Sequence, residues 1–117
     1  MAASLNAFAA TTIGFCECEL SSIKISQTPT GVAIHGKPEY EVSITNDCIC
    51  TQLDVVINCP GFHSVEGVRP SIFEPTGADL CTLKSGGPVF YNDVIKFKYA
   101  SDHSIALTPS SSRISCS

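Results

Sequence analysis

Residues 39–59 read EYEVSITNDCICTQLDVVINC, and this stretch decides the fold class. Apolar residues alternate with polar ones on both sides of the Asn-Asp-Cys-Ile-Cys motif at its centre. The alternating apolar positions are Tyr40, Val42 and Ile44 before the motif and Leu53, Val55 and Ile57 after it. A period of two places these side chains on one face of a β-strand and the polar ones on the other. The stretch therefore predicts two half-buried strands that flank a cysteine pair.

The same alternation recurs outside this stretch, in SSIKIS at residues 21–26 and VIKFKYA at residues 94–100. Turn-forming clusters of Gly and Pro separate the segments, at residues 28–31, 35–38, 59–61, 74–77 and 85–88. Residues 104–107 and 113–116 are expected to be further strands, with the polar residues 108–113 as a loop before the last one. Short strands punctuated in this way predict an all-β fold, an antiparallel β-sandwich of about seven or eight strands.

Seven cysteines in 117 residues indicate a sandwich braced by disulfides. Such density is typical of small secreted domains, in which bridges supplement a small core. Cys16 with Cys18, and Cys48 with Cys50, form Cys-x-Cys pairs whose members share a face when extended. Bridging within such a pair would make a strained ring, so each member is expected to reach a distant cysteine. An odd count leaves one thiol over from three bridges, and about 105 pairing schemes stay open.

The chain divides into an apolar N-terminal segment and one domain. Residues 1–15, MAASLNAFAATTIGF, carry no Lys or Arg, and they are interpreted as the remnant of a secretion signal or as an incomplete or artificial start. Residues 16–117 have the length and pattern of a single cysteine-rich domain.

Charge and hydropathy exclude two classes of partner. The formal net charge is −4, and the seven Lys and Arg residues are scattered, which argues against a nucleic-acid partner. No apolar run approaches the roughly 20 residues that a membrane-spanning helix needs, so we expect no membrane insertion.

The sequence contains no motif that is typical of catalysis or metal binding. The sequence has neither a Gly-x-Ser-x-Gly elbow nor an Asp-x-Asp-x-Asp run, and Glu39 and Glu41 alternate with apolar residues, which predicts that both face solvent. Cysteines with His35, His63 and His103 could in principle bind zinc or copper, but the histidines are isolated and the knuckle spacing is absent. We therefore expect no catalytic residue, no metal and no cofactor, and not an enzyme.

Two lysines alternate with large apolar residues near the C-terminus. Lys96 and Lys98 fall between Ile95, Phe97 and Tyr99, so both ammonium groups are predicted to face solvent. Lysines at such positions protect an edge strand from aggregation, and a partner-binding patch is the alternative.

Longer motifs point to a known family. They are CELSSIKISQ at residues 18–27, GKPEYEV at 36–42, NDCIC at 46–50, CPGF at 59–62, DLC at 79–81, KSGGPV at 84–89 and IKFKYA at 95–100, with the closing Cys116. In this order they resemble the tapetum determinant-like family of small secreted plant proteins, over nearly the whole chain from about residue 16 to residue 116. The tight Cys48-Ile49-Cys50 pair and Cys59-Pro60-Gly61-Phe62 resemble a divergent subgroup.

The resemblance implies a function and a set of structural cysteines. The family's founding member is a secreted ligand of a leucine-rich-repeat receptor kinase and directs anther cell fate, so the expected role is a non-catalytic signalling ligand of such a receptor in plant cell-fate specification. The expected location is extracellular, in the apoplast. By the same resemblance the shared disulfide cysteines would be Cys18, Cys48, Cys50, Cys59, Cys81 and Cys116, with Cys16 unpaired or extra.

Three residues in the turn-rich middle are candidates for receptor contact. They are Arg69, Phe73 and Lys84, because Arg and aromatic residues are enriched at binding hot spots, although burial statistics favour a core position for Phe73. The alternative function is an extracellular cell-wall or carbohydrate-binding module, which the absence of Trp disfavours. The oligomeric state is left open by the sequence.

Overall fold

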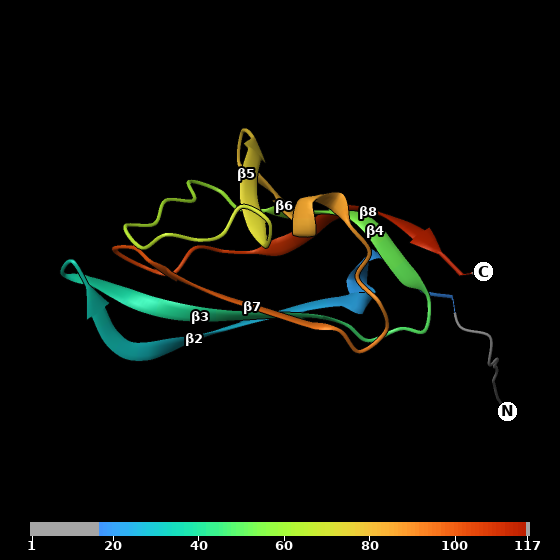
Figure 1. Cartoon of the computed structure of the whole chain (residues 1–117), viewed down its shortest axis with the longest axis horizontal. Helices are drawn as coiled ribbons and strands as arrows, with labels where there is room; N and C mark the ends of the chain where they lie inside the picture. The colour runs from blue at the N-terminus through green and yellow to red at the C-terminus, as the bar shows by residue number, and fades with distance from the viewer. Residues whose placement is uncertain (1–16, 117) are drawn as a thin grey trace, which may run out of the picture.

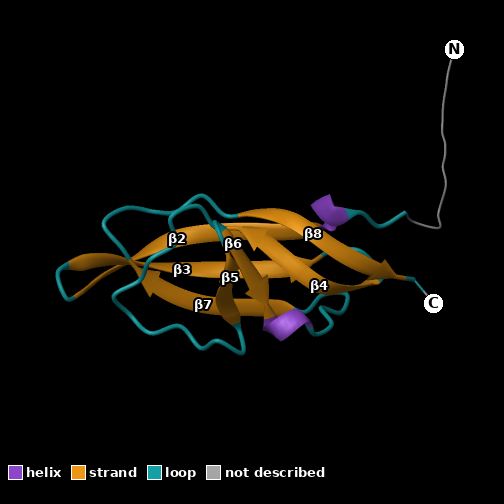
Figure 2. Ribbon diagram, turned by 90° about the horizontal axis from the view of Figure 1, so that it is seen from above, coloured by secondary structure: helices purple, strands orange, loops and turns teal. Residues whose placement is uncertain are grey.

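The computed structural model describes residues 17–116, and in these residues two antiparallel sheets of three and four strands pack face to face (Figure 1). Two short 3-10 helices, η1 (Leu20–Ser22) and η2 (Lys84–Gly86), accompany the strands, as Figure 2 shows. The predicted all-β class and strand number are confirmed. In the described part of the chain, no helix is long and apolar enough to cross a membrane.

The three-stranded sheet contains β2 (Ile23–Ile34), β3 (Lys37–Asn46) and β7 (Val94–Ala100), in the order β2-β3-β7. His35 and Gly36 form the two-residue turn between β2 and β3, with φ values of +50° and +78°. Positive φ at both positions is typical of a type I′ turn, whose twist matches that of the flanking strands.

The four-stranded sheet contains β4 (Thr51–Asn58), β5 (Phe73–Gly77), β6 (Leu80–Leu83) and β8 (Thr108–Ser115), in the order β5-β6-β4-β8. The core lies between the two sheets. Val42, Ile44 and Tyr99 of the first sheet and Val55 and Ile57 of the second are all fully buried in it.

Two turn predictions were wrong. Residues 28–31 continue β2 through a register shift between Pro29 and Ala33, where Gly31 takes a φ of +84°. Residues 74–77 belong to strand β5, and the turn follows them at residues 78–79. In each case pairing with a neighbouring strand outweighs the local preference of Pro and Gly for turns.

The C-terminal prediction was also wrong in its boundaries. Residues 108–113 belong to β8, which is an edge strand and pairs with β4. Backbone pairing at an edge does not require large apolar side chains, so the polar sequence there did not predict a strand. Residues 104–107 form no strand. The Ile105 N–H donates instead to the Tyr99 hydroxyl at 2.8 Å, and the Ile105 carbonyl accepts from Gln27 Nε2 at 2.7 Å.

Three disulfides brace the sandwich, and they use the six cysteines that the family resemblance implies. Cys18–Cys48 and Cys50–Cys116 lie at the end of the molecule where the described chain begins and ends (Figure 1). Cys59–Cys81 joins the end of β4 to β6. The predictions for residues 1–15 and for Cys16 lie outside the described residues.

Candidate functional site

The candidate site is built on residues 59–72, the connection between β4 and β5, which we call the β4–β5 loop. Long connections without regular structure in small domains are usually functional. This loop lies over one side of the sandwich and contacts both sheets, so its two anchors decide the shape of the surface.

The first anchor is a turn at Cys59-Pro60-Gly61-Phe62. The Phe62 N–H donates to the Cys59 carbonyl at 3.0 Å, and Gly61 has a φ of +65°, which suits a turn with Pro and Gly at its centre. Asp79 holds the turn from the β5–β6 connection: its carbonyl accepts from Cys59 N at 2.8 Å and its Oδ1 from Gly61 N at 3.1 Å. With the Cys59–Cys81 disulfide, these bonds fix the start of the loop on the four-stranded sheet.

The second anchor joins the loop to the end of β7. The Val65 N–H donates to the Ala100 carbonyl at 2.9 Å, and the Ala100 N–H donates to Ser64 Oγ at 3.0 Å. Ser64 Oγ also donates to the Glu66 carbonyl at 2.7 Å, which tightens the loop around this point. The loop is therefore tied to the three-stranded sheet at its middle.

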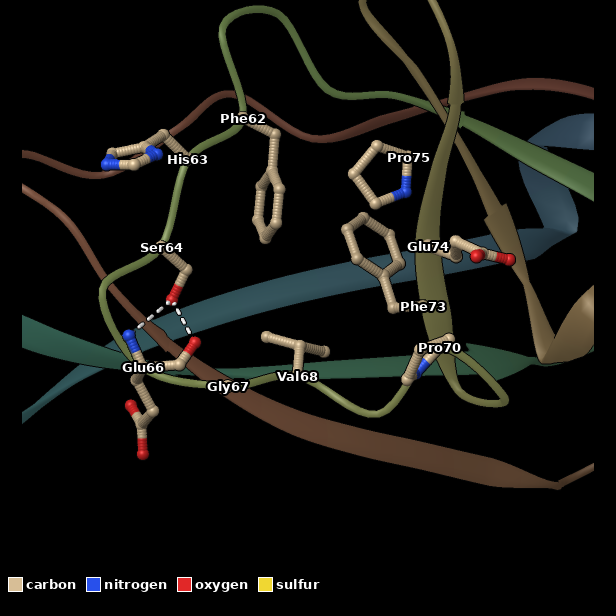
Figure 3. A pocket seen from close by; sticks show the side chains of 10 residues that line it. All are labelled: Phe62, His63, Ser64, Glu66, Gly67, Val68, Pro70, Phe73, Glu74 and Pro75. Atoms are coloured by element: carbon tan, nitrogen blue, oxygen red, sulfur yellow. Dashed lines mark hydrogen bonds between the residues drawn. The ribbon is translucent and has the colours of Figure 1, made fainter.

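Two hollows of about 310 Å³ each lie beside the loop, and Glu66, Gly67 and Val68 line both. Figure 3 shows the first hollow, where the side chains of Phe62, Val68, Phe73 and Pro75 come together while those of His63 and Glu74 point away. The Phe62 and Phe73 rings pack edge to face at 5.2 Å between centroids. This hollow is mainly apolar and shallow.

The second hollow runs along β7, and we call it the β7 groove. Its charged lining consists of Arg69 from the loop, Lys96 and Lys98 from β7, and the carboxyl side chains of Glu41 and Glu66. Lys96, Lys98 and Arg69 are all exposed. The groove thus presents cationic groups beside a strand edge.

A pair of carboxyl groups lies at the end of this groove. Glu39 is only 5% exposed, and its Oε1 accepts a hydrogen bond from Thr30 Oγ1 at 2.7 Å. That bond, the interaction with Glu66 and the charge of Lys98 together hold the pKa of Glu39 below its ordinary value. Burial, followed by the interaction with Glu39, raises the pKa of Glu66. The two carboxyl groups therefore shift in opposite directions, and Glu66 is the one that binds its proton more tightly.

The structure separates the three contact candidates. Arg69 is exposed on the loop and lines the β7 groove. Lys84 is half-buried, and its Nζ donates to the Pro88 carbonyl at 2.8 Å, which ties the side chain to its own turn. Phe73 is only 1% exposed and stacks on Phe97 at 4.4 Å between ring centroids, so the choice of Phe73 as a contact residue was wrong.

Sequence reasoning missed the Glu39–Glu66 pair. The alternation places Glu39 on the outer face of β3, but Glu39 is buried there beside Thr30 and Glu66, so the prediction that it faces solvent was wrong. No local signal could have revealed this contact, because Glu66 comes from a distant, irregular segment. Lys96 and Lys98 were predicted to face solvent, and both are exposed on an edge strand.

Three sulfur atoms gather at the disulfide end of the sandwich. The Sγ atoms of Cys18, Cys50 and Cys116 lie within 4.8 Å of one another. Each belongs to a disulfide in the structure, and a sulfur in a disulfide lacks the thiolate charge that binds a metal. In this oxidised form the cluster serves as a covalent brace.

Comparisons with known proteins agree on one family. The family model described as "Tapetum determinant 1, C-terminal" matches residues 19–117. The "TPD1 protein homolog 1B" of Oryza sativa subsp. japonica is 33% identical over 91 residues, which cover 77% of this chain and 54% of that protein. The "TPD1 protein homolog 1A" of the same organism is 29% identical over 83 residues, covering 64% and 37%. The chain thus spans about half or less of these curated relatives, and no solved structure matches it.

Proposed function

Because this chain belongs to the tapetum determinant 1 family, we propose that it is a non-catalytic extracellular signalling ligand that acts in plant cell-fate specification. Membership of the family suggests a developmental signalling role. The observation that carries the proposal is the extent of the family match, because residues 19–117 include every strand of both sheets and five of the six bridged cysteines.

The proposed partner is the ectodomain of a leucine-rich-repeat receptor kinase. A repeat-built ectodomain offers an extended concave surface, and a specific complex there buries about 1,600 Å² in total. A sandwich braced by three disulfides suits this role, since a rigid ligand loses little conformational entropy when it binds.

We place the contact surface on the side of the β4–β5 loop. Arg69 is exposed there, and Arg is among the residues that contribute most at binding hot spots. The loop is anchored to both sheets through Cys59 and Val65, so its surface is already formed before binding.

The disulfides also support an extracellular location and a non-catalytic mechanism. Disulfides persist in oxidising compartments, and three of them in so short a chain are consistent with an extracellular protein, so we propose secretion to the apoplast. Six of the seven cysteines are consumed in these bridges, which removes their thiolates as nucleophiles. Binding alone is then the mechanism of signalling.

A direct binding assay tests the proposal. The oxidised protein is passed over a panel of immobilised plant leucine-rich-repeat receptor kinase ectodomains, and we expect saturable binding to at least one of them. Arg69→Glu is expected to weaken that binding at least about tenfold. Lys24→Glu, the same reversal of charge at an exposed position on β2, is expected to leave it unchanged.

The alternative module is tested in the same preparation by a pull-down on insoluble cell-wall polysaccharide. Binding to polysaccharide without affinity for any ectodomain would overturn the ligand proposal. Reduced cysteines in protein taken from its native compartment would overturn the extracellular location.

A further inference from the structure

Strand β7 is an edge of the three-stranded sheet, because it pairs only with β3. The direction of its backbone groups follows from residues at its end. The N–H and carbonyl of Ala100 both bond to the β4–β5 loop, at Ser64 Oγ and Val65 N, while the N–H of the next residue, Ser101, donates to the carbonyl of Pro38 in β3. Ala100 therefore directs both its polar backbone groups away from β3.

Lys96 and Lys98 share this direction. In an antiparallel strand the N–H and C=O of alternate residues point to the same side, so residues 96, 98 and 100 face one neighbour and residues 95, 97 and 99 the other. Among residues 17–116, the β4–β5 loop bonds to β7 only at Ala100. The following loop residues, 66–69, line the groove beside β7. In the described part of the chain, no other strand takes the place beside Lys96 and Lys98, and both residues line the β7 groove.

The charges of the groove favour an acidic occupant. Arg69, Lys96 and Lys98 line it, against the carboxyl groups of Glu41 and Glu66. Burial, followed by the interaction with Glu39, raises the pKa of Glu66, which favours its neutral form. The groove is therefore locally positive in a chain whose formal net charge is −4.

The same lysines exclude the most obvious competitor, a second copy of this edge. Two β7 strands brought side by side would set lysines against lysines, which is a known device against edge-to-edge association. The same lysines would attract a strand with acidic side chains. The edge therefore disfavours pairing with a second β7 strand and favours pairing with an acidic partner.

We propose that the free edge of β7 binds an extended acidic segment of a partner protein, which adds to the β2-β3-β7 sheet as a fourth strand. Backbone hydrogen bonds to Lys96 and Lys98 supply affinity, and Arg69 with the two ammonium groups selects for acidic side chains. This inference rests on the proposed function only in assuming that the partner is a protein.

The probe is a synthetic peptide of alternating Glu and Val, added at millimolar concentration to the oxidised, ¹⁵N-labelled chain. Amide hydrogen exchange is followed residue by residue. We expect the peptide to slow exchange of the Lys96 and Lys98 amide protons at least about tenfold. The amides of Phe97 and Tyr99, which already pair with β3, are expected to change little. A peptide of alternating Lys and Val should have no effect on any of the four.

Two variants separate backbone pairing from charge. Lys96→Pro removes an N–H that faces the groove without breaking a bond to β3, so it should abolish protection at Lys98 while the sheet is retained. The double variant Lys96→Glu with Lys98→Glu keeps the backbone N–H groups but reverses the charge. It should no longer bind the acidic peptide and should bind the basic one. Lys24→Glu, on the opposite edge strand of the same sheet, is the matched control.

The outcomes distinguish this inference from the proposed function. Absence of protection at Lys96 and Lys98, or equal protection by the acidic and basic peptides, overturns the strand-addition site. Either result leaves the signalling proposal standing, because the ectodomain assay tests that proposal separately. Protection of β7 by the acidic peptide, with no ectodomain bound, supports the site and counts against the receptor.

Discussion

At the scale of single residues, the opposite pKa shifts of Glu39 and Glu66 link the β4–β5 loop to pH. The raised pKa of Glu66 stabilises the fold below the ordinary glutamate value of 4.5, and this contribution is lost as pH rises through the raised pKa. The lowered pKa of Glu39 acts in the opposite sense, and its contribution is lost as pH falls through the lowered pKa. Together these two contributions favour the folded state most near the ordinary glutamate pKa.

The first prediction concerns Glu66→Gln, which keeps a neutral group beside Glu39 at every pH. We expect the variant to unfold about 1–3 °C higher than the parent chain at pH 7.5, an effect kept small by solvent around the pair. Below the ordinary glutamate pKa the two proteins should converge, because Glu66 is then neutral in both. Thermal unfolding followed by circular dichroism from pH 3.5 to pH 8 measures the difference.

Glu74→Gln is the control for this measurement, since Glu74 is exposed and its side chain points away from the hollow in Figure 3. It should change the unfolding temperature little. A Glu66→Gln protein that is less stable than the parent by the same amount at every pH would contradict the raised pKa of Glu66.

At the scale of elements, the β2–β3 hairpin depends on the backbone of its turn. Gly36 has a φ of +78°, and a Cβ there would meet no atom within 4 Å. The cost of a side chain is therefore conformational and not steric. The hairpin aligns Glu39 with Ala100 of β7 through the register of the sheet, so this turn also places the carboxyl pair.

The second prediction is that Gly36→Ala lowers the free energy of unfolding by about 1 kcal/mol. Gly67→Ala is the matched control, because a Cβ at Gly67 also meets no atom within 4 Å and its φ lies outside the left-handed region. Gly67→Ala should be neutral or slightly stabilising. Urea unfolding of both variants measures the contrast, and equal costs would show that turn geometry is not the cause.

At the scale of the whole molecule, the disulfides differ in how much chain they constrain. Cys50–Cys116 joins residues separated by 66 positions, and Cys59–Cys81 joins residues separated by 22. In the chain-entropy model, a bridge that closes a longer loop removes more freedom from the unfolded state. The Cys50–Cys116 disulfide should thus contribute more stability than the Cys59–Cys81 disulfide.

The third prediction follows from this difference. Replacing both Cys50 and Cys116 by Ser should cost about 4 kcal/mol, and replacing both Cys59 and Cys81 about 3 kcal/mol. Denaturant unfolding of the oxidised double variants measures both costs, and mass spectrometry of unreduced digests checks that the remaining bridges keep their pairing. A smaller loss for the Cys50 and Cys116 variant would contradict the entropic account.

Local patterns in the sequence were sufficient for the fold class, the faces of β3 and β7, and the turn at residues 35–36. They were not sufficient for Leu53 in β4, where a register shift after Leu53 leaves Gln52 buried in its place. These features depend on neighbours two or three residues apart, so periodicity and turn chemistry reveal them. The order of longer motifs likewise identified the family and its six structural cysteines. The net charge and the scattered basic residues predicted that nucleic acid is not a partner.

Tertiary structure alone decided which cysteines pair, that residues 108–115 form an edge strand, that Glu66 lies against Glu39, and that β7 has a free edge. The first three are contacts between segments far apart in the chain, and the fourth is the lack of such a contact beside β7 in the described residues. Such contacts depend on the closing of long loops and on competition among partners, which no local pattern encodes. The candidate site is made almost wholly of such contacts, and for that reason the sequence predicted the scaffold better than the site.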